Sequence, residues 1–110
     1  MAEVRLPAPV KAVLVDGADD RMDADDRVAI PGAFWFVTYQ GELAGMIYVC
    51  PCGCRRQGYL RFRGAPRPPE EADRPSWEWD GNREAPTLSP SVLHRDHWHG
   101  YLRAGMWVQA

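Results

Sequence analysis

The chain has 110 residues, of which 45% are hydrophobic and 25% charged, and its formal net charge is −2. This length fits a single domain over residues 1–110. The negative total excludes a generally basic protein that coats nucleic acid, and the absence of an apolar run of roughly 18 residues predicts that no membrane is involved.

The N-terminal part, residues 1–43, is predicted to contain short strands and an acidic loop. Its first ten residues, MAEVRLPAPV, have no basic segment followed by an apolar one, so we expect no signal peptide. The loop DGADDRMDADDR (16–27) contains six aspartates. It lacks the D-x-D-x-D-G pattern of a calcium loop, which favours a solvated loop. An alternative stays open, in which Asp19, Asp20 and Asp23 imitate phosphates and occupy a basic groove on a partner.

Along the whole chain, short runs rich in Val, Ile, Tyr, Phe and Trp are separated by ten glycines and ten prolines. Such runs predict strands. They are Val10–Val15, Arg27–Ile30, Ala33–Tyr39, Met46–Val49, Tyr59–Arg63, Trp77–Trp79 and Tyr101–Val108. In the fifth run, Leu60 and Phe62 alternate with polar residues and should face the core. We therefore predict a mostly β fold, a small antiparallel sheet or barrel-like domain with loops rich in proline and glycine.

All three cysteines lie in CPCGC, as Cys50, Cys52 and Cys54. A disulfide between alternate residues would be strained, whereas three thiolates on one side of a turn suit zinc. All three histidines lie in HRDHWHG (94–100), and His97 and His99 would share one face of a strand. We predict a structural zinc site in residues 44–110, with either three cysteines and one histidine or two of each as ligands.

Two further segments have more than one interpretation. The segment 64–76 holds four prolines and is expected to form a mobile loop. Five arginines without an intervening acid lie nearby: Arg55, Arg56, Arg61, Arg63 and Arg67. They form either the solvated face of a strand or a surface that contacts a partner, and the first four are our candidates for such contacts.

The segment PTLSPSV (86–92) carries three hydroxyl groups. A nucleophilic serine needs a general base and an oxyanion hole. Because the G-x-S-x-G pattern is absent and no glycine adjoins either serine, we expect these hydroxyls to cap turns and predict no catalytic residue.

Four motifs in order, CPCGC, WEWDGN, APTLSPSV and WHGYLRAGMW, resemble a family of small uncharacterised domains that phages and prophages commonly encode. The resemblance covers roughly residues 44–108. It places His99 on the family's histidine and Asp96 on the family's late cysteine, so that Cys54, His97 or His94 would complete the ligand set. It implies a zinc-binding β domain in a viral or mobile-element setting, and it implies no activity. Because no signal peptide is expected, such a protein would lie in the host cytoplasm or in the virion.

These observations together predict a non-enzymatic protein that acts by binding a protein complex. It would be a virion or assembly component, or an inhibitor of a host defence complex such as an anti-CRISPR. Two alternatives stay open. One is a metal-dependent hydrolase that uses Asp96, His97 and His99, and the other is a nucleic-acid-binding zinc ribbon that uses the arginines.

Overall fold

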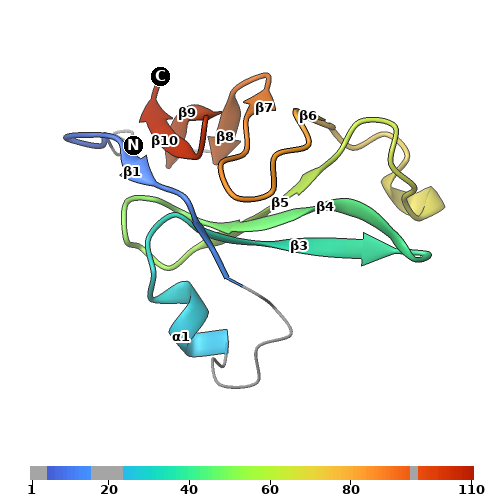
Figure 1. Ribbon diagram of the computed structural model, residues 1–110, viewed down its shortest axis with the longest axis horizontal. Coiled ribbons are helices and arrows are strands. Elements are labelled where there is room, and N and C mark those ends of the chain that lie inside the picture. Colours follow the sequence, from blue (N-terminus) through green and yellow to red (C-terminus); the bar gives the residue numbers. More distant parts are fainter. Residues whose placement is uncertain (1–4, 16–23, 95–96) are drawn as a thin grey trace.

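Two four-stranded sheets pack face to face in the computed structural model, which describes residues 5–15, 24–94 and 97–110 (Figure 1). The first sheet has the order β1 (Val10–Lys11), β10 (Met106–Gln109), β9 (Trp98–Arg103) and β8 (Val92–His94). The second has the order β2 (Val13–Leu14), β3 (Ala33–Tyr39), β4 (Glu42–Val49) and β5 (Gln57–Arg61). The remaining elements are α1 (Ala24–Val28), the 3-10 helix η1 (Pro69–Glu71) and the strand pair β6 (Glu78–Trp79) and β7 (Leu88–Ser89).

The main core lies between the two sheets. Phe34 from β3 and Trp98 and Trp107 from the first sheet are fully buried there. Burying each such side chain contributes about 2–3 kcal/mol. The Trp107 indole N–H donates a hydrogen bond of 2.9 Å to the carbonyl of Gly32, so the packed sheets are also joined by a polar contact.

A smaller core lies on the other face of the second sheet. Alternation along β3 sends Phe34 toward the first sheet and Ala33 and Trp35 toward the opposite face. There Val28, at the end of α1, packs against the cluster that includes Ala33 and Val49. Figure 1 shows α1 beneath this sheet, on the side away from β8–β10.

The predicted mostly β fold is confirmed, with the detail that the sheets form a two-layer sandwich. The strand Ala33–Tyr39 has the predicted bounds, and Leu60 and Phe62 are 3% and 5% exposed, as their alternation indicates. The predicted strand Arg27–Ile30 is wrong, because α1 extends to Val28. In the part of the chain that the structure describes, no helix is long and apolar enough to cross a membrane.

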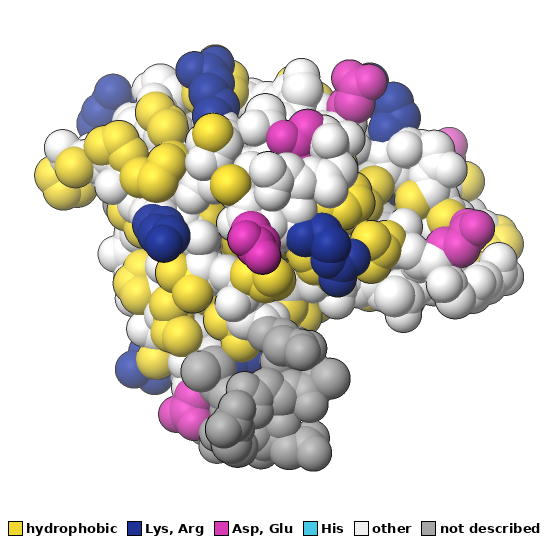
Figure 2. Space-filling model, in the orientation of Figure 1, with side chains coloured by type: hydrophobic (Ala, Val, Ile, Leu, Met, Phe, Trp, Pro, Cys, Tyr) yellow, Lys and Arg dark blue, Asp and Glu magenta, His cyan; other side chains and the backbone are white. Residues whose placement is uncertain are grey.

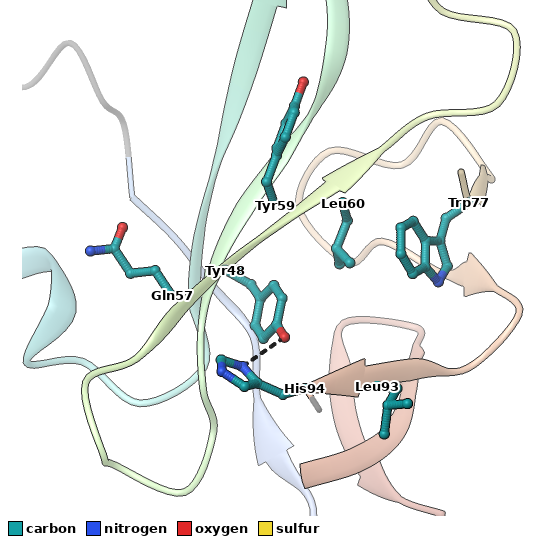
Figure 3. A pocket seen from close by; sticks show the side chains of 8 residues that line it. Tyr48, Gln57, Tyr59, Leu60, Trp77, Leu93 and His94 are labelled. Carbon is teal, nitrogen blue, oxygen red and sulfur yellow. Dashed lines mark hydrogen bonds between the residues drawn. The ribbon is translucent and has the colours of Figure 1, made fainter. Parts of the chain in front are cut away.

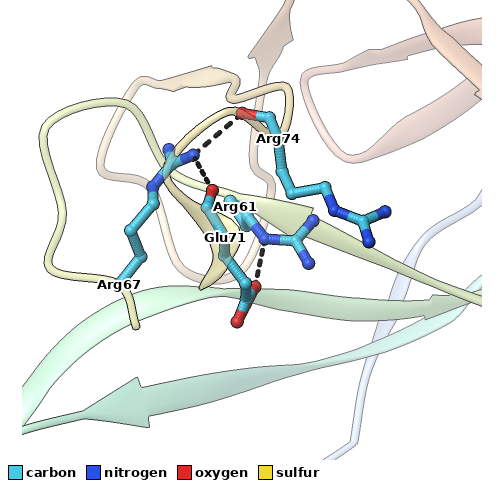
Figure 4. A network of polar contacts seen from close by, with 4 residues as sticks. All are labelled: Arg61, Arg67, Glu71 and Arg74. Carbon is cyan, nitrogen blue, oxygen red and sulfur yellow. Dashed lines mark hydrogen bonds and ion pairs between the residues drawn. The ribbon is translucent and has the colours of Figure 1, made fainter. Parts of the chain in front are cut away.

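Two other segments differ from a simple reading of the sequence. The run 101–108 divides into β9 and β10 because Ala104 and Gly105 adopt positive φ angles of 47° and 77° and form a turn. The segment 64–76 contains η1, and Arg67 donates hydrogen bonds to the carbonyls of Glu71 and Arg74 at 3.0 and 2.8 Å (Figure 4). A short helix and two local hydrogen bonds therefore shape this proline-rich segment.

Candidate functional site

The cysteine segment forms a tight turn after β4. The Cys50 N–H donates to the carbonyl of Arg56 at 2.8 Å, and the Gly53 N–H donates to the carbonyl of Cys50 at 3.3 Å. Gly53 has a φ of 92°, a conformation that glycine adopts without steric cost. The turn brings the Sγ atoms of Cys50 and Cys52 to 3.4 Å from each other. The sequence CPCGC thus folds so that its sulfurs gather on one side.

One histidine from the distant β8–β9 connection joins the three sulfurs. The Nε2 atom of His97 lies 3.1 Å from the Sγ of Cys52, and one ligand atom from each of Cys50, Cys52, Cys54 and His97 lies within 4.8 Å of the others. Ligands about 2.3 Å from a tetrahedral zinc lie about 3.7 Å from one another. Three thiols and one imidazole in this arrangement form a group that is able to hold a metal ion.

The electrostatics of the turn distinguish its sulfurs. Burial raises the pKa of the Cys50 thiol. Partial burial on its own would raise the pKa of the Cys54 thiol. The Arg56 N–H, which donates to the Cys54 Sγ at 3.5 Å, acts in the other direction and helps to lower this pKa overall. A bound cation would favour the thiolate form of all three.

His99 lies outside this sulfur group, contrary to the prediction that it is a metal ligand. Its Nε2 atom is 2.9 Å from the Oγ of Ser91. The β8–β9 register places Leu93 opposite His99, so Ser91 lies two positions from His99's direct partner, on the same face. Such diagonal neighbours across two antiparallel strands are close enough for long side chains to meet. The hairpin therefore creates a serine–histidine pair.

Hydrogen bonds to the backbone hold both members of this pair. The Trp77 indole N–H donates to the carbonyl of Ser91 at 3.1 Å. The carbonyl of His99 accepts bonds from the Gln109 side chain at 3.2 Å and from the Ala110 N–H at 3.1 Å. Both side chains are partly exposed. Ser91 lines a cavity of about 460 Å³ together with Thr87, Ser89, Tyr101 and Arg103.

The third histidine, His94, contacts neither the sulfurs nor Ser91. Its Nδ1 atom lies 3.0 Å from the hydroxyl of Tyr48 (Figure 3). Burial raises the pKa of Tyr48, so the phenol keeps its proton at neutral pH. Burial, followed by the charges of His97 and Arg56, lowers the pKa of His94. A neutral His94 is therefore expected at neutral pH.

The candidate partner-binding arginines mostly contact their own chain. Arg61 forms an ion pair with Glu71 (Figure 4) and lies over the Tyr59 ring, and Arg63 lies 4.0 Å from Glu78. Arg55 and Arg56 belong to the cysteine turn. Figure 2 shows basic and acidic side chains interspersed on one face of the molecule. Asp19, Asp20, Asp23 and Asp96 lie outside the described residues.

The chain was compared with known proteins. The family model described as bacterial ubiquitination-like system serine protease, BubE, matches residues 19–110. The chain belongs to the BubE family. Neither the curated proteins nor the solved structures contain a match to it. The region that matches the BubE family includes both the sulfur group and the Ser91–His99 pair.

Membership of the BubE family corrects the functional prediction. The expectation of a non-enzymatic protein is wrong, because the family is described as a serine protease. The roles of virion component and of inhibitor of a host defence complex are wrong for the same reason. The match names a bacterial system, and it gives no support to a phage or prophage setting. The two alternatives, a metal-dependent hydrolase and a zinc ribbon, are likewise replaced by the protease description.

The hydroxyls of PTLSPSV, predicted to cap turns, have different partners in the structure. Thr87 does cap a turn, since its Oγ1 accepts a hydrogen bond of 2.8 Å from the Ala104 N–H. Ser91 instead contacts His99 across a hairpin, an arrangement that does not require a G-x-S-x-G turn. A predicted strand over Val92–His94, paired with the strand that begins at Trp98, would have brought the two residues together.

Proposed function

We propose that this chain is a serine protease in which Ser91 is the nucleophile and His99 is the general base, acting within a bacterial ubiquitination-like system. The observation that carries the proposal is the 2.9 Å contact between Ser91 Oγ and His99 Nε2. A serine hydroxyl is a weak nucleophile at neutral pH, and an adjacent imidazole activates it. The family description supports the same chemistry.

The pair can perform both halves of peptide hydrolysis. His99 Nε2 accepts the hydroxyl proton as Ser91 Oγ attacks the scissile carbonyl carbon, and it then donates that proton to the leaving amine. Water then loses a proton to the same nitrogen and attacks the acyl carbon, and the imidazolium returns that proton to Ser91 Oγ as the bond between Oγ and the acyl carbon breaks. Within the described part of the chain the Ser91 N–H has no hydrogen-bond partner, so it is available to the oxyanion.

In the described part of the chain, the hydrogen bonds that hold the strand at His99 go to its backbone, and no carboxylate contacts its ring. Across residues 5–15, 24–94 and 97–110, no hydrogen bond to its Nδ1 atom is present. Its carbonyl is bound to Gln109 and Ala110, and the strand that carries it begins one residue after His97. The position of the proposed general base therefore depends on these bonds and also on what holds His97, next to the start of β9.

The sulfur group supplies that support in our proposal, with zinc as the metal. Three thiolates and one imidazole are the donors that zinc prefers in a closed, four-ligand structural site. When bound, zinc would act as a cross-link between the cysteine turn and the β8–β9 connection. His97 would be fixed by the cross-link, and His99, two residues later, would be held beside Ser91.

Active-site labelling tests the assignment of the nucleophile. An alkyl fluorophosphonate should modify the wild-type protein at Ser91 and should fail to modify Ser91→Ala, because the reagent reacts with an activated serine. Ser89→Ala is the matched control: this exposed serine, two residues away, has no histidine contact in the described structure, so labelling should be retained. Equal labelling of wild type and Ser91→Ala would overturn the proposal.

A further inference from the structure

The edge strand β8 has an unpaired side beside the serine–histidine pair. The first sheet ends at β8, and no strand covers its outer edge in the described structure. Ser91 precedes this strand by one residue. The backbone groups that β8 presents along that edge are the ones it does not use to bond with β9.

The alternation of hydrogen bonds along the sheet identifies the residue of β8 whose backbone groups point to the outer edge. In an antiparallel ladder, neighbouring residues point their N–H and C=O groups alternately to one side and to the other. The Ala110 N–H donates to the carbonyl of His99, so His99 points toward β10. Leu93, which is paired with His99, therefore cannot bond to it and directs its own N–H and C=O to the outer edge. No described residue bonds to these two groups.

The neighbouring outward carbonyl is already occupied. The carbonyl of Ser91 points to the same edge and accepts the Trp77 indole N–H at 3.1 Å. Leu93 is therefore the position at which β8 offers an open donor and an open acceptor. Leu93 as a whole residue is 60% exposed.

A cavity of about 350 Å³ lies at this edge. Figure 3 shows Leu93 and His94 on one side and Leu60 and Trp77 on the other, while Tyr59, which also lines the cavity, directs its ring away from Leu93 and His94. None of the lining residues is an aspartate, glutamate, lysine or arginine. A lining without these charged side chains, with apolar and aromatic residues in it, fits a neutral polypeptide backbone with apolar side chains better than a phosphate or another charged ligand.

The opposite wall is also a strand edge. The Phe62 N–H donates to the carbonyl of Ala44, so by the same alternation Tyr59 on β5 points its backbone groups away from β4, toward the cavity. The next outward carbonyl on β5, that of Arg61, accepts the Trp77 N–H at 2.7 Å. The chain's own segment at Trp77 thus pairs with this edge and leaves the stretch at Tyr59 open.

We propose that the substrate binds as an extended polypeptide segment that adds to the outer edge of β8, with its backbone hydrogen-bonded to Leu93. This inference rests on the proposed function and names the substrate class. Strand residues rise about 3.3 Å each, so a substrate paired at Leu93 reaches Ser91 after two residues, about 7 Å away. β-strand addition supplies affinity through the main chain, and the aromatic walls contact the alternate side chains.

The variant Leu93→Pro tests the proposal. Proline removes the outward N–H and places its ring on the open edge. It leaves the ladder to β9 intact, because that ladder does not use the Leu93 N–H. The substrate is a mixture of unstructured 14-residue peptides that together contain every pair of neighbouring residues, and mass spectrometry measures the products. Cleavage by Leu93→Pro should fall about tenfold or more at all sites. Fluorophosphonate labelling of Ser91 should stay within about twofold of wild type.

Leu93→Ala is the matched control, since it keeps the N–H and removes the side chain. It should alter cleavage at some sites and spare others. Equal cleavage by the two variants would overturn the inference. If wild-type protein labels at Ser91 but cleaves no peptide of the mixture, the extended-segment substrate is wrong while the protease assignment stands. If Ser91 does not label, the protease assignment itself is wrong.

A second measurement needs no variant of the protein. In the best-cleaved peptide, each backbone nitrogen in turn is replaced by N-methyl. Loss of cleavage by about tenfold should concentrate at the residue two positions from the scissile bond, whose N–H would bond to the Leu93 carbonyl. An even effect at all positions would contradict pairing with β8.

Discussion

Two histidines separated by one residue have different partners, and we expect them to carry different tasks. His97 Nε2 lies 3.1 Å from a cysteine sulfur, and His99 Nε2 lies 2.9 Å from a serine oxygen. His97→Ala should therefore lower the bound metal and the melting temperature together. His99→Ala should keep the metal and lower the rate of hydrolysis by about a hundredfold or more, since it removes the general base.

Elemental analysis and peptide cleavage on the same preparations distinguish the two histidines. Cys52→Ser should behave like His97→Ala, and Ser91→Ala should behave like His99→Ala. Loss of metal in His99→Ala, with metal retained in His97→Ala, would reverse the assignment.

At the scale of elements, the hairpin of β8 and β9 depends on a glycine. A Cβ atom at Gly100 would lie 2.3 Å from the Trp98 ring and 2.3 Å from the carbonyl oxygen of Val108. Val92 pairs with Gly100 on the other side. Gly100→Ala should therefore destabilise the fold by about 3 kcal/mol, because neither a buried ring nor a sheet backbone yields easily.

Urea unfolding measures this effect. Gly41→Ala is a useful comparison because a Cβ atom there meets nothing within 4 Å, and its φ of 80° alone carries a cost of about 1 kcal/mol. If Gly100→Ala unfolds at the same urea concentration as Gly41→Ala, the close packing of Trp98 is not what restricts position 100 to glycine.

The elements that could be predicted from sequence are those whose signal is local. Alternation of apolar and polar residues identified the faces of the strand that contains Leu60 and Phe62, and spacing identified the cysteines as one ligand group. The strand Val92–His94 was missed because Pro90 and the flanking serines are typical of turns. With that strand missing, the contact between Ser91 and His99 could not be predicted, because it depends on the register of the hairpin.

At the scale of the whole molecule, the sulfur group joins the two sheets at one end. The cysteines follow β4 of the second sheet, and His97 precedes β9 of the first. Elsewhere Trp107 and Gly32 link the layers. A sandwich of this size buries a limited core, so a cross-link between its layers should contribute much of its stability.

Metal removal tests this dependence. Treatment with a zinc chelator at neutral pH should lower the melting temperature by more than about 10 °C, since structural zinc sites contribute about 10 kcal/mol or more to folding. Hydrolysis should decline as well, because release of His97 loosens the start of the strand that carries His99. Zinc addition should restore both properties in wild type and neither in Cys52→Ser. A protein that keeps its melting temperature but loses hydrolysis on chelation would show instead that the metal takes part in the reaction.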